Sequence, residues 1–209
     1  FSSFHASRIE GLSALEVEGY LRQALGDAAL PEGFAEKLHQ ATGGNVSFIE
    51  EYLKLLLESG RIVREGAGWR FEPGEALDVP PTVEDALARR LARIEGTPRD
   101  VLGWLAVVDK PALPEEIASL MDEGKPASGS SPEAIEAALG NLARTGFLER
   151  EGRRHGFASA AARSVAYHAL AETERRRRHG LVAARLLATK GALPPLEEIA
   201  HHLFHSEEP

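Results

Sequence analysis

Apolar side chains recur every three or four residues along most of this chain, and glycine or proline separates one such stretch from the next. The clearest stretch is 46–59, where leucine, isoleucine and aromatic residues form a wide apolar stripe at helical spacing. Such a stripe has to pack against other helices, because alone it would expose too much apolar surface to water. The sequence therefore predicts a mainly α fold, built from several short helices around shared cores.

The first part of the chain, residues 1–78, predicts a three-helix domain that ends in a small β-hairpin. We expect its helices over 13–25, 31–42 and 46–59. The first helix should begin after Ser13, which has the capping-box spacing to Glu16. Residues 61–71 place β-branched and aromatic residues on either side of a glycine-containing turn, which is typical of two short strands.

Residues 79–160 predict a second domain, in which helices precede another small hairpin. Thr82 is a candidate helix cap with Asp85 one turn later. Helices are then expected over 82–95, 98–109, 113–122 and 132–144, with strands at 147–150 and 155–158. Three helices followed by a hairpin is the order of a winged helix. Residues 161–209 predict further helices. We interpret them as the possible start of an α-solenoid, such as a series of TPR-like repeats.

The composition argues against several classes of protein. The chain has no cysteine, which excludes disulfides and thiol chemistry and fits a cytoplasmic protein. No apolar run is long enough for a membrane span, and the first residues lack the layout of a secretory signal. The net charge of −8 argues against a nucleic-acid binder. Because the chain opens on Phe1 and stops at Pro209, we expect it to be cut from a longer protein.

The sequence offers no motif for phosphate binding or bond chemistry. The candidate pair Gly124-Lys125 follows Ser119 where a phosphate-binding loop needs glycine, and Pro126 comes next. Residues 105–109, LAVVD, look like a magnesium-binding strand, but their apolar spacing predicts a buried helix that ends at Asp109. No spaced Ser/His/Asp signature is present. We therefore expect no catalytic residue in this chain.

The last predicted helix carries a histidine group. His201 and His205 lie one turn apart, which is the spacing of helical metal ligands, and His202 is adjacent. The sequence places no third ligand beside that one-turn pair. We therefore predict no metal there and expect the histidines to be solvated or partly packed at a helix end.

Two basic clusters are candidate contacts for DNA or for a partner protein. They are the predicted wing, with Arg150, Arg153 and Arg154, and the run that contains Arg175 and Arg176. On a helix, the four consecutive arginines 175–178 should point around most of the circumference as a solvated band. The predicted recognition helix 132–144 carries Glu133 and Glu136, which would repel a phosphate backbone. DNA binding is therefore not expected.

Taken in order, these segments resemble one family. Residues 42–71 are similar to the helical lid of STAND-type AAA+ ATPases, in which a Gly-Asn-Pro-led helix precedes a short hairpin. Residues 79–94 and 100–109 resemble the entry and the next helix of that family's winged-helix domain. Residues 155–187 and 196–209 are similar to its closing segment and to the start of its helical repeats. The ATPase core with its phosphate-binding loop is missing from this resemblance.

The resemblance also implies nucleotide-sensing positions, and two of them depart from the family pattern. Gly44 and Asn45 are kept, but Val46 stands where the family has a proline that packs near the nucleotide base. After the wing's phenylalanine, Ser159 stands where the family has a nucleotide-sensing histidine. Proline presets the backbone at a helix start and histidine supplies a ring nitrogen, so both contacts should be weakened.

From the resemblance we expect a non-catalytic regulatory and interaction module, which relays the state of an ATPase core to helical repeats. Its expected partners are the adjacent NTPase core, the helical repeats of the parent chain, or a partner protein, and no membrane. We expect no cofactor in this segment, since ATP or ADP would belong to the core. Two alternatives stay open: a protein-binding adaptor without a nucleotide cycle, and a winged-helix DNA-binding module.

Overall fold

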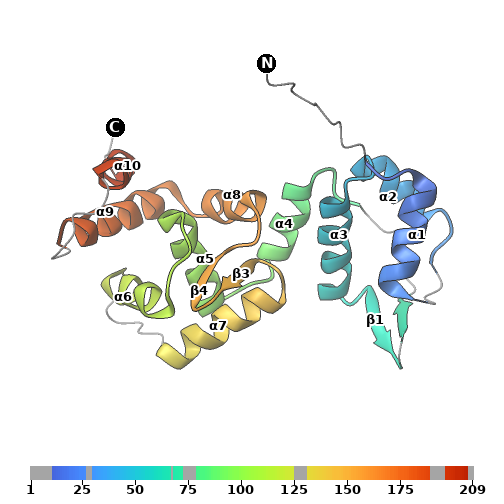
Figure 1. The fold of residues 1–209 in the computed structure, drawn as a ribbon, viewed down its shortest axis with the longest axis horizontal. Coiled ribbons are helices and arrows are strands. Elements are labelled where there is room, and N and C mark those ends of the chain that lie inside the picture. Colours follow the sequence, from blue (N-terminus) through green and yellow to red (C-terminus); the bar gives the residue numbers. More distant parts are fainter. Residues whose placement is uncertain are drawn as a thin grey trace, which may run out of the picture. The chain divides into compact units, whose positions relative to one another are not determined.

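The computed structural model describes residues 11–26, 30–66, 68–72, 79–124, 131–188 and 196–206. It is mainly helical with two small antiparallel hairpins, which confirms the predicted fold class (Figure 1). Contacts divide the chain into two compact units, 1–90 and 91–209. Among the described residues, no helix is both long and apolar enough to cross a bilayer. The predicted boundaries at 78/79 and 160/161 stay predictions, and residues 73–78, which precede the first of them, lie outside the described residues.

In its described residues, the first unit contains three helices, a hairpin and most of a fourth helix. They are α1 (Ala14–Leu25), α2 (Phe34–Thr42), α3 (Val46–Glu58), β1 (Ile62–Glu65), β2 (Gly68–Phe71) and α4 (Val83–Leu91). The predicted capping box is present, because the Ser13 N–H donates to the Glu16 carboxylate (2.8 Å) and the Glu16 N–H donates to Ser13 Oγ (3.4 Å). The prediction that α2 begins at Pro31 is wrong. Gly33 adopts a left-handed conformation (φ 66°), so regular helix starts only at Phe34.

One core holds α1, α2, α3 and the β1–β2 hairpin together. Phe34 of α2 contacts the rings of Tyr52 on α3 and Phe71 on β2, with centroid separations of 6.3 and 5.3 Å. The remaining buried residues come from α1, α2, α3 and β1; they include Val17, Leu21, Leu25, Leu38, Ile49, Leu56 and Ile62. The predicted cap of α4 is confirmed, because the Asp85 N–H donates to Thr82 Oγ1 (3.1 Å). The buried Arg90 of α4 donates to the carboxylates of Glu51 and Glu58 on α3.

The second unit begins with α5 (Thr97–Val108), which is contacted by α6, α7, α8 and α9. All residues from Val101 to Val108 are buried, and Asp109 ends the helix in a left-handed conformation (φ 57°). The prediction that LAVVD forms a buried helix is thereby confirmed. The unit continues with α6 (Pro114–Gly124), α7 (Pro132–Arg144), β3 (Leu148–Glu151) and β4 (Arg154–Phe157). Ala112, between α5 and α6, exchanges two backbone hydrogen bonds with His155 of β4 (3.0 and 2.9 Å). The order of three helices and a hairpin agrees with the predicted winged-helix order.

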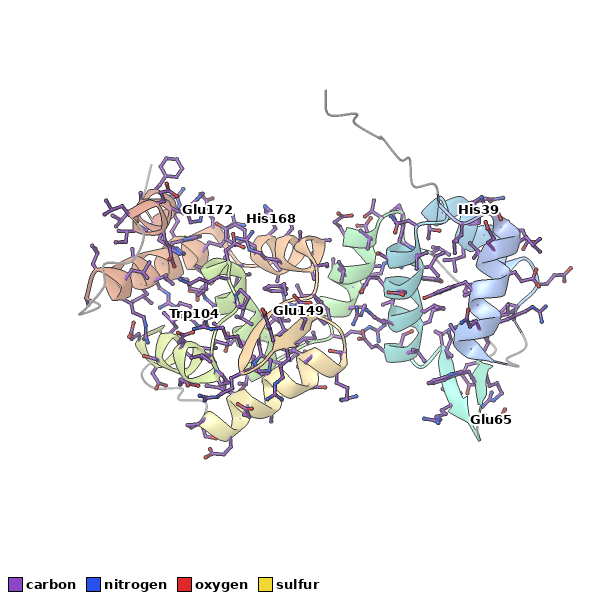
Figure 2. The ribbon with its side chains drawn as sticks, viewed as in Figure 1. His39, Glu65, Trp104, Glu149, His168 and Glu172 are labelled. Atoms are coloured by element: carbon purple, nitrogen blue, oxygen red, sulfur yellow. The ribbon has the colours of Figure 1, made fainter. Side chains whose placement is uncertain are left out.

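Three more helices follow in the part of this unit that the structure describes. The predicted helical stretch 160–187 is two helices, α8 (Ala160–His168) and α9 (Glu172–Ala188), followed by α10 (Leu196–Ser206). Figure 2 labels His168 and Glu172 at the turn that joins α8 to α9. The last of these helices, α10, packs against α9 (Figure 1).

The arginine run on α9 is not the solvated band that its composition suggests. The Arg178 side chain is buried, with its guanidinium carbon 4.7 Å from the centre of the Trp104 ring. Trp104 lies on α5, among the side chains that fill the interior of the second unit (Figure 2). Gly103 makes this stacking possible, because a Cβ at that position would come within 2.5 Å of Arg178 Nη1. The prediction of a solvated band is therefore wrong for Arg178.

A candidate metal centre between α9 and α10

Four histidines gather where α9 packs against α10. His179 comes from the middle of α9, and its ring centre lies 5.7, 5.0 and 5.1 Å from those of His201, His202 and His205 on α10. His179 and His202 are each 1% exposed, whereas His201 faces solvent. The group thus has a buried inner part and an outer part that water can reach.

A chain of hydrogen bonds runs through the buried part. The Tyr167 hydroxyl of α8 lies 3.0 Å from His179 Nε2, and His179 Nδ1 lies 2.8 Å from His202 Nδ1. One of two facing Nδ1 atoms has to donate and the other has to accept, which requires one proton between them. Two neutral imidazoles satisfy this arrangement.

Burial favours the neutral rings. It is the main cause that lowers the pKa of His179 to about 3, and the neighbouring histidines lower this pKa further. Burial likewise lowers the pKa of His202 to about 4, helped by His201. Neutral imidazole nitrogen carries the lone pair that a metal ion needs.

The geometry brings three such nitrogens to one point. His179, His201 and His202 each offer one ligand atom, and these atoms lie within 4.8 Å of one another. The sequence predicted no metal because no third ligand could be placed beside the histidines of α10. The structure supplies that residue, His179, from a position 22 residues before His201. Neither His179 nor Tyr167 lies at a sequence spacing from the histidines of α10 that would mark it as part of a metal site.

The predicted nucleotide-sensing positions of the first unit have structural roles. The Gly44 carbonyl accepts from the Leu12 N–H (2.9 Å), and a Cβ at Gly44 would come within 2.0 Å of the Leu12 carbonyl oxygen. Asn45 caps α3 by accepting from the Phe48 N–H (3.2 Å). Val46 is 37% exposed at the first position of that helix. The local backbone therefore requires glycine at position 44 and favours asparagine at position 45, without any role for a nucleotide.

Ser159 lies in the second unit, where it caps α8 by accepting from the Ala162 N–H (3.1 Å). It also lines a cavity of about 280 Å³, together with Lys110 and Arg163. Lys110 pairs with Glu198, and Arg163 pairs with Asp109 at 2.6 Å. The cations of this cavity are thus already balanced by carboxylates.

The basic residues that were candidate contacts for DNA or a partner are engaged within the second unit. Arg153 pairs with Glu115 (3.0 Å), and Arg154 pairs with Glu116 (3.2 Å), so α6 balances two charges of the hairpin. The remaining contacts are Arg150 to the Gly152 carbonyl, Arg175 over the Tyr167 ring and Arg176 to Glu172. The hairpin therefore presents much less free positive charge than its sequence suggests.

Comparison with known proteins returns no significant match: no family model, no curated protein and no solved structure. The resemblance to STAND-type ATPases therefore rests on the residues and on the order of segments. At the level of class, the chain is a mainly helical protein with two small hairpins. Within its described residues, His179, His201 and His202 form a group that could hold a metal ion.

Proposed function

We propose that this chain is a cytoplasmic, non-catalytic regulatory and interaction module of a STAND-type signalling ATPase. In this proposal the segment binds no nucleotide tightly and hydrolyses none. It passes the state of an adjacent ATPase core to helical segments that dock on its last helix. The adaptor without a nucleotide cycle is the alternative that shares this docking surface.

The observation that carries the proposal is an outward apolar stripe on α10. Its inward face packs Ile199 and His202 into the second unit, where they are 7% and 1% exposed. Leu196, Leu203 and Phe204 lie at positions i, i+7 and i+8 of the same helix and are 76%, 42% and 74% exposed. A helix with a second apolar stripe is suited to contact another helix, as neighbouring helices do in a solenoid.

Electrostatics favours a protein partner over DNA. The arginines of the β3–β4 hairpin are paired or hydrogen-bonded, and α7 begins with the exposed Glu133. DNA binding requires a basic surface that releases counterions from several phosphates. A partner helix with apolar residues needs no such surface.

The experiment uses the parent chain with its ATPase core and measures amide hydrogen exchange in α10. We expect slower exchange in the parent chain than in the 209-residue chain, and different exchange with ATP and with ADP. The double substitution Leu203→Ser with Phe204→Ser should remove both differences, because it deletes most of the outward stripe.

Leu15→Ser is the control, since Leu15 is an exposed leucine (78%) on α1, outside the proposed docking surface. It should leave exchange in α10 unchanged. Equal exchange of α10 in the parent and in the shorter chain, under both nucleotides, would sink the relay proposal. Protection that is present but indifferent to nucleotide would favour the adaptor instead, and ATP turnover by the 209-residue chain would overturn the non-catalytic assignment.

A further inference from the structure

We propose that His179, His201 and His202 bind one divalent transition-metal ion, with Zn²⁺ as the natural occupant, and that this ion joins α9 to α10. The inference goes beyond the proposed function, because it depends on neither an ATPase core nor a docking partner. It rests on the convergence of three imidazoles from two helices.

The ligand atoms are close to the geometry that zinc requires. Zn–N bonds are about 2.0–2.1 Å long, so two nitrogens on a tetrahedral ion stand about 3.3 Å apart. The facing Nδ1 atoms of His179 and His202 are 2.8 Å apart, and all three ligand atoms lie within 4.8 Å of one another. A displacement of about half an ångström opens the buried pair, and the ligand atom of His201 has to move inward by up to about 1.5 Å to reach the same separation.

Proton bookkeeping also permits the ion. The buried pair shares one proton between its Nδ1 atoms, and this proton has to leave that position when the ion enters. His179 can carry it on Nε2, where the Tyr167 hydroxyl is placed to accept at 3.0 Å. Tyr167 thereby takes the part of the outer hydrogen-bond partner that orients a metal-bound histidine. The rings bind as neutral ligands, with no net loss of a proton.

The surroundings indicate both the kind of metal and its route. An all-imidazole ligand set suits Zn²⁺, Cu²⁺ or Ni²⁺ and disfavours Mg²⁺ and Ca²⁺, which prefer oxygen. The exposed His201 gives the ion access from solvent and leaves a fourth position open to water. His205, with its ring centre 4.5 Å from that of His201, flanks this open side.

The consequence for the fold is a clamp between two helices. His179 holds one end from α9, while His201 and His202 hold the other from successive positions of α10. A bound ion stabilises whichever state holds all three ligands together. Zinc should therefore stabilise the docked position of α10.

The test titrates Zn²⁺ into the tag-free, chelator-treated chain by calorimetry and repeats the titration with Co²⁺, whose visible spectrum reports its ligands. We expect one ion per chain, a Kd of about 1 µM or tighter, and a tetrahedral Co²⁺ spectrum. Zinc should also raise the melting temperature reported by Trp104. His201→Ala should weaken binding at least tenfold without loss of helical content, because this side chain is exposed in the ion-free fold.

Two further variants separate a built site from casual histidine binding. Tyr167→Phe keeps all three ligands and should weaken Zn²⁺ binding by about 10- to 100-fold, the usual effect of losing an outer partner. His168→Ala, at an exposed histidine on α8, should change neither affinity nor stoichiometry. The proposal is overturned if the chain takes up no zinc at free Zn²⁺ concentrations about tenfold above 1 µM. It is also overturned if His201→Ala binds zinc as tightly as the unmodified chain.

Discussion

At the scale of single residues, Arg178 connects α9 to the buried helix α5. Its guanidinium stacks on Trp104, donates to Glu174 (2.7 Å) and lies 3.6 Å from Asp100 of α5. A buried cation needs such partners, because an unpaired charge in the interior costs several kcal/mol. Glu174, one turn earlier on α9, is the carboxylate that serves both Arg177 and Arg178.

Glu174 should make the stability of the second unit depend on pH. Hydrogen bonding from Arg177, and then from Arg178, holds the pKa of this carboxyl at about 2, compared with its usual 4.5. A lowered pKa stabilises the fold at pH values above 4.5, and this stabilisation is lost as pH falls from 4.5 toward 2. We expect Glu174→Gln to lower the free energy of unfolding at pH 7 by roughly 1–3 kcal/mol and to flatten its decline in that window.

Urea unfolding between pH 7 and pH 2, followed by Trp104 fluorescence in a Trp69→Phe background, measures this effect. Glu172→Gln is the control, because Glu172 pairs with Arg176 on the same helix but is 63% exposed. It should cost less than about 1 kcal/mol. An unaltered pH profile in Glu174→Gln would show that the carboxyl does not carry the dependence.

At the scale of elements, α5 and α7 use glycine for different reasons. Gly103 lies inside buried α5, where an added Cβ would meet Arg178 Nη1 at 2.5 Å and Leu170 Cδ2 at 3.0 Å. Gly140 lies on the exposed side of α7, and nothing lies within 4 Å of the corresponding Cβ. The first glycine is required by packing, whereas the second only weakens its helix.

The same substitution should therefore have opposite effects at these two sites. Gly140→Ala should stabilise the second unit by about 0.5–1 kcal/mol, because alanine has the higher helix propensity. Gly103→Ala should destabilise it by about 1–3 kcal/mol, since Arg178 has to leave its place on Trp104. Urea midpoints of the two variants test this, and stabilisation by both would mean that Arg178 is not held as described.

At the scale of the whole molecule, the chain has two cores and carries one tryptophan with each. Trp69 packs against the core of the first unit, and Trp104 is buried in the second. Leu21 and Leu102 are fully buried, one in each core. Each unit thus has an internal reporter and an internal leucine whose truncation would leave a cavity.

We expect each cavity to lower the free energy of unfolding mainly of the unit that contains it. Leu21→Ala should lower the unfolding free energy reported by Trp69 by about 2–5 kcal/mol. Leu102→Ala should lower the unfolding free energy reported by Trp104 by a similar amount. Trp104→Phe and Trp69→Phe backgrounds isolate the two signals. If either truncation shifts both transitions equally, the units unfold as one cooperative structure.

Local signals in the sequence identified most elements of both units. The capping box at Ser13, the cap at Thr82 and the buried helix ending at Asp109 each depend on residues a few positions apart. The start of α2 was predicted too early, because the left-handed backbone at Gly33 prevents regular helix from beginning at Pro31. The break between α8 and α9 was missed because the three residues between them, Ala169, Leu170 and Ala171, include no glycine or proline to mark a helix end.

The sequence by itself determined where helices and hairpins form, because capping, turn chemistry and apolar period act over one or two turns of chain. Only the tertiary structure decided what Arg178 and the histidines do. Trp104 lies 74 residues from Arg178, and His179 lies 22 residues from His201. No local pattern encodes such pairs, since they meet only after α9 has packed against α5 and α10. The candidate metal centre is thus a product of helix packing, while each histidine alone resembles an ordinary helix residue.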